Sequence, residues 1–260
     1  MAFFDCHFFS ETLALSVSAH VIVPQLPAAQ RRLHPVLFLL HGLSDDHTMW
    51  TRRTSIERYA AERNLAVVMP AVGRSFYQDT AGGARYWTFL SEELPAVMRS
   101  FFPLSEKRAD NFAAGLSMGG YGALRLALSH PEKFAAVASF SGALDYVRRL
   151  REAGRPRSRI SKAEWDSVAG PGADAEGTAS DLFHLAKRAA KNNAKGRGPK
   201  PAVWLSCGTG DDIISDTRAF HRHLETLGWK HRHEESPGAH DWAYWDAQIQ
   251  RAIAWLPIRK

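Results

Sequence analysis

The sequence has little cysteine and no long apolar run. Its 260 residues include only two cysteines, Cys6 and Cys207, too few for the disulfide framework of a small secreted domain and not spaced as metal ligands. No apolar stretch approaches the roughly 18–20 residues that a membrane-spanning helix needs. Residues 1–15 contain Asp5 and Glu11 and lack the basic, apolar and small-residue order of a secretory leader. These absences predict a reduced, cytoplasmic protein without a membrane partner.

Acidic residues are scarce in one segment only, residues 146–200. The formal net charge is +6, yet this segment holds 13 of the 33 Lys and Arg residues and 6 of the 27 Asp and Glu residues, a net of +7. The rest of the chain, with 20 basic and 21 acidic residues, has a net charge of −1. The segment has few aromatic side chains on which bases would stack (Tyr146, Trp165 and Phe183). We therefore expect no nucleic-acid partner, and a local charge that attracts acidic substrates.

Short apolar runs alternate with helical patterns along the chain. An alternating run at 12–23 predicts a half-buried antiparallel strand. Near-continuous apolar runs typical of strands covered on both faces are at 36–40, 66–69, 111–116, 135–140 and 202–206, and a shorter strand is expected at 231–235. Helical patterns cover about 52–63, 91–102, 118–129, 216–227 and 242–256, with Asp216 and Asp241 as expected N-caps of the last two. This order predicts an α/β fold with a mostly parallel sheet, in one domain over 1–260.

Residues 146–200 interrupt that alternation. Weak helical patterns there are joined by stretches rich in Gly, Pro, Arg and Lys. We interpret the segment as a small basic cap inserted between two strands and lying over one end of the sheet. Its apolar residues are expected to face inward as the roof of a substrate pocket; they are Leu150, Trp165, Val168, Leu182, Phe183 and Leu185.

The sequence Gly115-Leu116-Ser117-Met118-Gly119 joins the strand at 111–116 to the helix at 118–129. It matches the G-x-S-x-G pattern in the strand–turn–helix setting where a nucleophilic serine occurs. Small neighbours are needed because such a turn strains the backbone, and the helix N-terminus favours developing negative charge. We predict that Ser117 is a nucleophile.

A serine nucleophile needs a base and an orienting acid, which follow it in the order acid, then histidine, in this kind of fold. The strand at 202–206 leads into Asp211 and Asp212, and both qualify as the acid, with Asp211 favoured because it stands three residues after Gly208. His240 follows the last strand in a loop from which it can reach the serine. We predict that His240 is the base.

An oxyanion hole needs two backbone N–H donors. Met118, the residue after the nucleophile, is expected to provide one. The loop after the strand at 36–40 is expected to provide the other, from Leu43, with Gly42 or Ser44 as alternatives.

Other histidines suggest no metal centre. His231 and His233 share a strand face, but no cysteine or acid completes a ligand set there. The sequence predicts neither a metal site nor a cofactor.

With these residues identified, the chain resembles the esterase D / tributyrin (acetyl) esterase group of α/β-hydrolases over nearly its whole length. The resemblance rests on LLHGLSDDHTMW (39–50), SEELPAVMRSFFP (91–103), KRADNFAAGLSMGGYGALRLAL (107–128), SFSGALD (139–145), CGTGDD (207–212) and PGAHDWAYW (237–245). It implies the α/β-hydrolase fold, a Ser117–Asp211–His240 triad, an oxyanion hole from Leu43 and Met118, and a homo-oligomer such as a dimer or tetramer.

The resemblance also implies hydrolysis of short-chain acyl esters, from acetyl to butyryl, of a small-molecule substrate. Gly42, Trp165 and Tyr121 are the expected substrate contacts. Tyr121 stands where S-formylglutathione hydrolases typically have histidine, so the match is closer to the tributyrin and acetyl esterases. An S-formylglutathione hydrolase, and an acetyl or feruloyl esterase acting on carbohydrate esters, are the alternatives.

Overall fold

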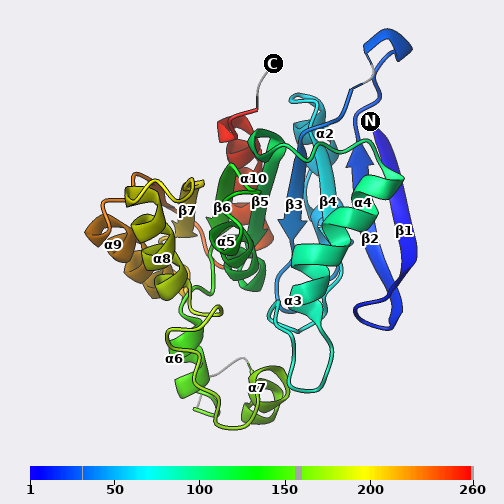
Figure 1. The fold of residues 1–260 in the computed structure, drawn as a ribbon. Helices are drawn as coiled ribbons and strands as arrows, with labels where there is room; N and C mark the ends of the chain where they lie inside the picture. The colour runs from blue at the N-terminus through cyan, green and yellow to red at the C-terminus, as the bar shows by residue number, and fades with distance from the viewer. Residues whose placement is uncertain (31, 156–159, 259–260) are drawn as a thin grey trace.

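A single eight-stranded sheet runs through the computed structural model, which describes residues 1–30, 32–155 and 160–258 (Figure 1). Its strand order is β1-β2-β4-β3-β5-β6-β7-β8. The strands are β1 (Ala2–Ser10), β2 (Leu15–Val23), β3 (Val36–Leu40), β4 (Ala66–Pro70), β5 (Asn111–Leu116), β6 (Ala136–Phe140), β7 (Ala202–Gly208) and β8 (Arg232–Ser236). β1 is antiparallel to β2, and β2 is antiparallel to β4. The other six strands, β3 to β8, are all parallel to one another. The mostly parallel sheet predicted from the apolar runs is confirmed.

Helices cover both faces of this sheet, so that two separate apolar cores form. One face carries α3 (Tyr86–Thr88), a π-helical turn (Phe89–Glu93), α4 (Leu94–Phe101), α5 (Met118–Ser129), α8 (Leu182–Ala194) and α9 (Ile214–Thr226). The other carries α1 (Met49–Arg53), α2 (Ile56–Ala61) and α10 (Trp242–Trp255). Short 3₁₀ turns lie at Ala28–Gln30 and Arg108–Asp110. Every residue of β3, β4, β5 and β6 is buried, as expected for strands covered on both sides.

Three features differ from the sequence predictions. β1 was not anticipated, the helix expected at 52–63 is the two short helices α1 and α2, and the helix expected at 91–102 begins near Tyr86. β1 escaped detection because its apolar residues occupy both faces and most of it is exposed. Within the described residues, no helix combines the length and apolarity required to traverse a bilayer.

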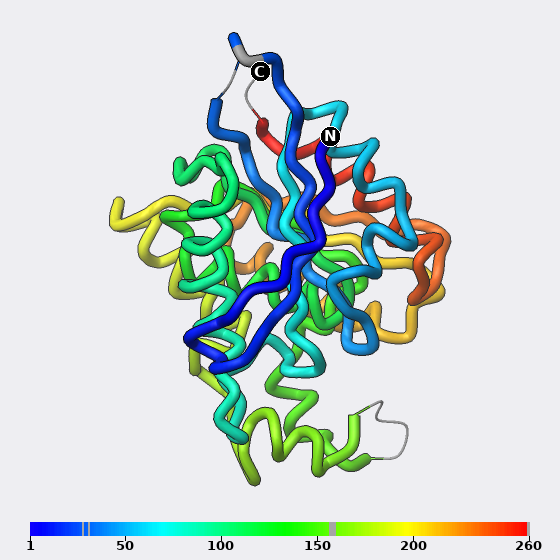
Figure 2. The backbone as a smooth tube through the Cα atoms, turned by 90° about the vertical axis from the view of Figure 1, so that its right-hand side faces the viewer, coloured from blue at the N-terminus to red at the C-terminus, as the bar shows by residue number. Residues whose placement is uncertain are grey.

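The two edge strands differ in composition. β8 reads RHEES, so charged side chains dominate it. β1 reads AFFDCHFFS, and Phe3, Phe4 and Phe9 are exposed. Figure 2 views the molecule toward the β1 edge, with β1 and β2 in dark blue nearest the viewer.

The basic segment 146–200 lies between β6 and β7 and has two parts. α6 (Tyr146–Arg151) and α7 (Lys162–Ala169) project beyond the carboxyl ends of the parallel strands (Figure 1). α8 instead packs against α5 and α9 as one of the helices that cover the sheet. The projecting part is therefore smaller than the predicted cap, and its residues 156–159 lie outside those that the structure describes.

Asp216 does not cap a helix, contrary to the sequence prediction. α9 begins two residues earlier, at Ile214. The Asp216 side chain is fully buried, and it accepts hydrogen bonds from the guanidinium groups of Arg148 and Arg149, the latter at 2.8 Å from Arg149 Nη2. Asp145 N–H also approaches it, at 3.3 Å. Asp216 therefore fastens the start of α6 to α9. The other predicted cap is confirmed, because the Asp241 side chain accepts from Tyr244 N–H at the start of α10.

Replacing Asp216 with asparagine is expected to lower the free energy of unfolding by about 1–3 kcal/mol. The change removes the buried charge that two guanidinium groups face, and the effect is limited because both arginines are partly exposed. Urea denaturation measures it. The matched control is Asp174→Asn, which breaks a solvent-exposed pair with Arg151 and should leave the denaturation midpoint nearly unchanged. Equal destabilisation by the two substitutions would contradict the assigned role of Asp216.

Candidate active site

Ser117 occupies the sharp turn between β5 and α5. Its backbone has φ +51° and ψ −118°, a region that side chains other than glycine rarely adopt. Ser117 N–H donates to Phe140 O at 2.9 Å, and its own carbonyl accepts from Ala143 N–H at 3.0 Å. β6 and the residues after it therefore hold this strained turn in place.

A glycine after the serine lets the turn lie against β3. A Cβ atom on Gly119 would lie 2.3 Å from Leu40 O and 2.6 Å from His41 O, so any larger residue would push α5 away from the end of β3. This close packing places the first turn of α5 beside the loop 41–48. The G-x-S-x-G sequence pattern thus has the strand–turn–helix setting that was predicted for it.

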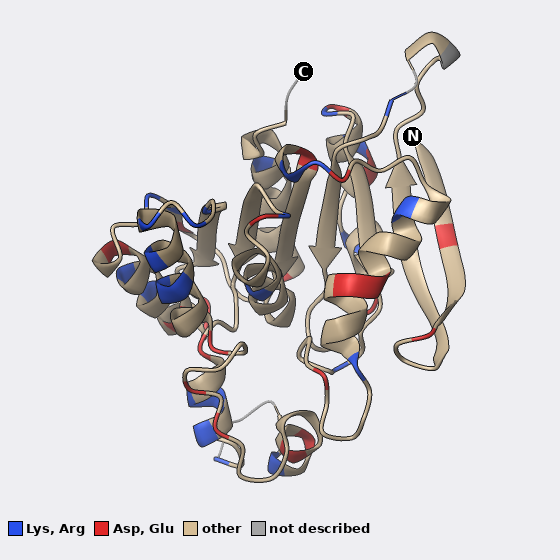
Figure 3. Cartoon of the chain, in the orientation of Figure 1, with Lys and Arg blue, Asp and Glu red and all other residues tan. Residues whose placement is uncertain are grey.

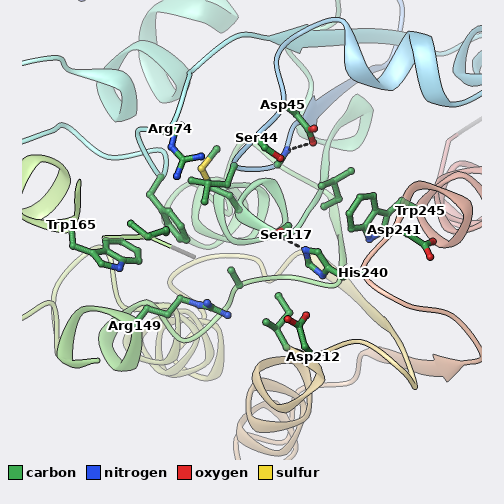
Figure 4. A pocket seen from close by; sticks show the side chains of 18 of the residues that line it. Ser44, Asp45, Arg74, Ser117, Arg149, Trp165, Asp212, His240, Asp241 and Trp245 are labelled. Carbon is green, nitrogen blue, oxygen red and sulfur yellow. Dashed lines mark hydrogen bonds between the residues drawn. The ribbon is translucent and has the colours of Figure 1, made fainter. Parts of the chain in front are cut away.

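His240 lies between Ser117 and Asp211. Its Nε2 is 3.0 Å from Ser117 Oγ (Figure 4). Its Nδ1 is 2.9 Å from Asp211 Oδ2. Because a carboxylate only accepts hydrogen bonds, Nδ1 carries the proton and Nε2 is free to accept the serine proton. The Trp245 ring stands edge-on to the imidazole at 4.9 Å and limits its tilt. This chain of hydrogen bonds is the geometry by which a histidine activates a serine.

Asp211 is buried, whereas Asp212 is exposed on the wall of the cavity. Burial raises the pKa of Asp211, but hydrogen bonds from His240, the Ser141 hydroxyl and Ile213 N–H outweigh it and hold that pKa below its ordinary value. Asp211 is therefore ionised at neutral pH and orients the imidazole. The structure brings Asp211, rather than Asp212, to His240.

Met118 and Leu43, the predicted oxyanion-hole donors, line the cavity from different elements. Met118 begins α5 and Leu43 lies in the loop after β3, and both line the same cavity as Ser117. Within the described residues neither N–H donates to another protein group. The Gly42 N–H, in contrast, donates to Asp45 Oδ2 at 3.1 Å, which removes Gly42 from the candidate donors; Gly42 still lines the cavity.

His41, to which the sequence patterns assigned no role, holds the loop that carries Leu43. Its Nε2 accepts from Val72 N–H at 3.1 Å, so its Nδ1 carries the proton and donates to Gly42 O at 2.7 Å. Tyr77 Oη donates to His41 O at 2.9 Å. Burial lowers the pKa of His41 to about 4, so the neutral ring that this pattern needs is the form present at neutral pH.

A cavity of about 780 Å³ opens over Ser117 and His240, a size in the range of small-molecule sites. The figure labels ten of its lining residues (Figure 4). Apolar side chains make one group of walls: Leu43, Phe76, Leu116, Met118, Ala143, Ile160, Ile213, Trp165, Trp242 and Trp245. The segment 146–200 contributes Ile160 and, from α7, Trp165 to these walls, and Arg149 of α6 to the polar part of the lining.

The predicted substrate contacts have different outcomes. Trp165 and Gly42 line the cavity. Tyr121 does not: it is fully buried, its ring stacks on Tyr146 at 5.2 Å, and its hydroxyl donates to Ser180 O at 2.8 Å. Its position within α5 turns it under the projecting helices, away from the cavity. The prediction that Tyr121 contacts substrate is therefore wrong, and Tyr121 supports the cap.

The positive charge of the segment is not concentrated in the cavity. Three arginines line the cavity, and each is paired with an acid: Arg74 with Glu164, Arg149 with Asp216 and Arg155 with Glu152. Four acids line it as well: Asp45, Glu152, Asp212 and Asp241. Exposed basic residues gather instead on and just after α8 (Figure 3), at Lys187, Arg188, Lys191 and Lys195. Among the described residues, the positive and negative charges that line the cavity are nearly equal in number. The basic segment therefore does not give the cavity the positive charge that was expected to attract acidic substrates.

The sequence and structure are similar to known esterases. A profile of the family described as "Putative esterase" matches residues 10–256. The chain is 29% identical over 268 residues to the acetyl esterase of Caldicellulosiruptor saccharolyticus, covering 98% of each protein. The structure matches the fluorophosphonate-binding serine hydrolase F of Staphylococcus aureus with a TM-score of 0.87 and 34% identity, covering 98% of both chains. It matches the S-formylglutathione hydrolase of Staphylococcus aureus with a TM-score of 0.84 and 33% identity, again over 98% of both. The predicted α/β-hydrolase fold and the resemblance to acetyl esterases are confirmed.

His41 is expected to make stability depend on pH between about 6.5 and 4. Below pH 6.5 the unfolded chain binds a proton on His41 that the folded chain refuses until about pH 4, so this contribution is complete above 6.5 and is lost as the pH falls. Between pH 7.5 and 5 the advantage of wild type over His41→Gln in free energy of unfolding should shrink by about 2 kcal/mol. Urea titrations at the two pH values measure this. A pH-independent difference would contradict the neutral, buried state of His41.

Proposed function

Because the chain belongs to this esterase family and is a carboxylic ester hydrolase, we propose that it hydrolyses short-chain acyl esters, from acetyl to butyryl, through Ser117, His240 and Asp211. The observation that carries the proposal is the hydrogen-bond chain from Asp211 through His240 to Ser117, which ends at the floor of an open cavity. Full-length similarity to an acetyl esterase supports the short acyl group.

In the first half of the proposed reaction, Ser117 Oγ attacks the ester carbonyl carbon while its proton passes to His240 Nε2. The carbonyl oxygen becomes an oxyanion, which the Met118 and Leu43 N–H groups stabilise. Asp211 stabilises the imidazolium that has formed. The tetrahedral intermediate then collapses, the bond to the alcohol oxygen breaks, and the alcohol leaves with the proton from His240.

In the second half, water takes the place of the alcohol. His240 removes a proton from the water as it attacks the acyl carbon, and the same N–H pair holds the second oxyanion. The bond to Ser117 Oγ breaks, the serine regains its proton from His240, and the carboxylic acid leaves. The enzyme returns to its starting state, and neither half requires a cofactor.

The lining of the cavity favours esters of uncharged alcohols. Its arginines are paired with acids, and further acids line the same space, so a substrate carrying carboxylates gains little net attraction there. A thioester such as S-formylglutathione is the second candidate. It is supported by the similarity to an S-formylglutathione hydrolase and by Arg74, which is about half-exposed and can exchange Glu164 for a substrate carboxylate.

Wild-type enzyme is expected to hydrolyse p-nitrophenyl acetate and butyrate with a kcat/KM at least tenfold above that for the octanoate, because its full-length relative is an acetyl esterase. Initial rates across the acetate-to-octanoate series test this. S-formylglutathione, measured alongside, should be turned over more slowly than the acetate. Octanoate as the preferred substrate would refute the short-chain assignment, and a tenfold preference for S-formylglutathione would establish the thioester alternative.

Ser117→Ala is expected to lower kcat on p-nitrophenyl acetate by about 10⁴–10⁶-fold, and Asp211→Asn by about 10⁴-fold because the imidazole loses its orienting charge. The matched control is Asp212→Asn, the neighbouring carboxyl that does not accept from His240 Nδ1, which should keep at least a third of kcat. Circular dichroism verifies that each variant folds. If Ser117→Ala retained more than a tenth of the activity, the assignment of Ser117 as the nucleophile would be contradicted.

A further inference from the structure

Four residues near the sheet edge form a cluster that the proposed reaction does not use. We call it the β1 histidine cluster: Asp5 and His7 on β1, His20 on β2, and His47 in the loop before α1. Asp5 and His20 are direct cross-strand partners in the β1–β2 register, so their side chains lie on the same face. His7, two residues after Asp5, shares that face. The register and the loop before α1 thus bring three imidazoles around one carboxylate.

The distances from Asp5 to the three histidines are close to those between ligands of one metal ion. His7 Nε2 lies 3.4 Å from Asp5 Oδ1, and His20 Nε2 and His47 Nε2 each lie 3.7 Å from the same oxygen. These distances are longer than ordinary N–H···O hydrogen bonds. They are close to the ligand–ligand separation of about 3.4 Å that follows from zinc–ligand bonds of about 2.1 Å in a tetrahedron. One ligand atom from each of Asp5, His20 and His47 lies within 4.8 Å of the others.

The hydrogen bonds of His20 show which of its nitrogens is available. Thr51 Oγ1 donates its only proton to Thr48 O at 2.7 Å. The same oxygen is 3.1 Å from His20 Nδ1, so Nδ1 must be the donor there, and a neutral His20 presents the lone pair of Nε2 to Asp5. A lone pair directed at a carboxylate oxygen is repulsive unless a cation lies between them.

The surroundings of the other histidines agree with this reading. His7 Nδ1 is 3.0 Å from the Ser18 hydroxyl, an outer partner of the kind that orients metal-bound imidazoles. His47 Nδ1 is buried and, within the described parts of the chain, has no hydrogen-bond partner. His20 and His47 are largely shielded, whereas about half of the Asp5 side chain is exposed, so an ion has a path from solvent.

We propose that the β1 histidine cluster binds a zinc ion through Asp5, His20 and His47. Imidazole nitrogens with one carboxylate suit zinc, whereas magnesium and calcium prefer oxygen ligands. This ion lies outside the cavity that contains Ser117. It links the edge strands β1 and β2 to the loop that carries Leu43.

Two other groups of side chains are alternative places for a zinc ion, and the experiment must distinguish them from the β1 histidine cluster. Asp211, Asp212 and His240 also have ligand atoms within 4.8 Å of one another, but His240 is already bonded to Ser117 and Asp211 there. His221 Nδ1 is 2.7 Å from His231 Nε2, a direct hydrogen bond that leaves no room for an ion between them.

The test is to incubate the full chain with ZnCl₂, remove unbound metal on a desalting column, and measure zinc by mass spectrometry. Wild type should retain about one zinc per chain. Asp5→Asn, His20→Gln and His47→Gln should each retain less than a tenth of that, and the control His221→Gln should retain it in full. Zinc at 50 µM should raise the Tm of wild type by about 5 °C or more and leave the Tm of Asp5→Asn unchanged.

Asp5 is half-exposed, so Asp5→Asn keeps the test valid even if a buried histidine variant fails to fold, which circular dichroism would reveal. Wild type that retains no zinc above the level of Asp5→Asn would overturn the proposal. Equal retention by wild type and Asp5→Asn, with loss in Asp212→Asn, would also overturn it by moving the ion to the cavity. The outcome does not depend on ester hydrolysis, because the readouts are metal content and Tm.

Discussion

The arrangement of the site depends on how closely α5 approaches the end of β3. The absence of a side chain at Gly119 lets the helix lie against the carbonyl groups of Leu40 and His41. This contact brings the Met118 N–H, at the start of α5, and the Leu43 N–H, after β3, to one side of the same cavity. Without this close approach the serine turn would still be held by β6, but Met118 and Leu43 would no longer line one cavity.

Local patterns were enough to predict the residues that end strands. Ser117 and Asp211 each follow a strand whose apolar run is visible in the sequence, and His240 follows the short polar strand expected at 231–235. Parallel strands bring their carboxyl ends to the same edge of the sheet. Tyr121 and Asp216 were misread because their roles are set by elements far along the chain. Tyr121 packs under α6, and Asp216 faces two arginines of that helix, contacts that no spacing within either local segment reveals.

The high charge of the segment 146–200 is distributed by its fold. Where the segment approaches the cavity its arginines face acids, some from the segment and some from the core. Where it covers the sheet, as α8, its lysines are exposed, because the opposite face of the helix packs on α5 and α9. A net charge counted along the chain therefore says little about the potential that a substrate meets, which is decided by the pairing of each side chain.

The two open edges of the sheet are unequally protected against the addition of another strand. β8 reads RHEES and has no apolar residue, so a foreign strand added there would have to desolvate charged side chains. Along β1, nine residues in extended conformation contain four phenylalanines and one carboxylate, Asp5. Intermolecular pairing, and the aggregation that can follow from it, would therefore start at β1, where one negative charge is the main obstacle to a cross-β stack.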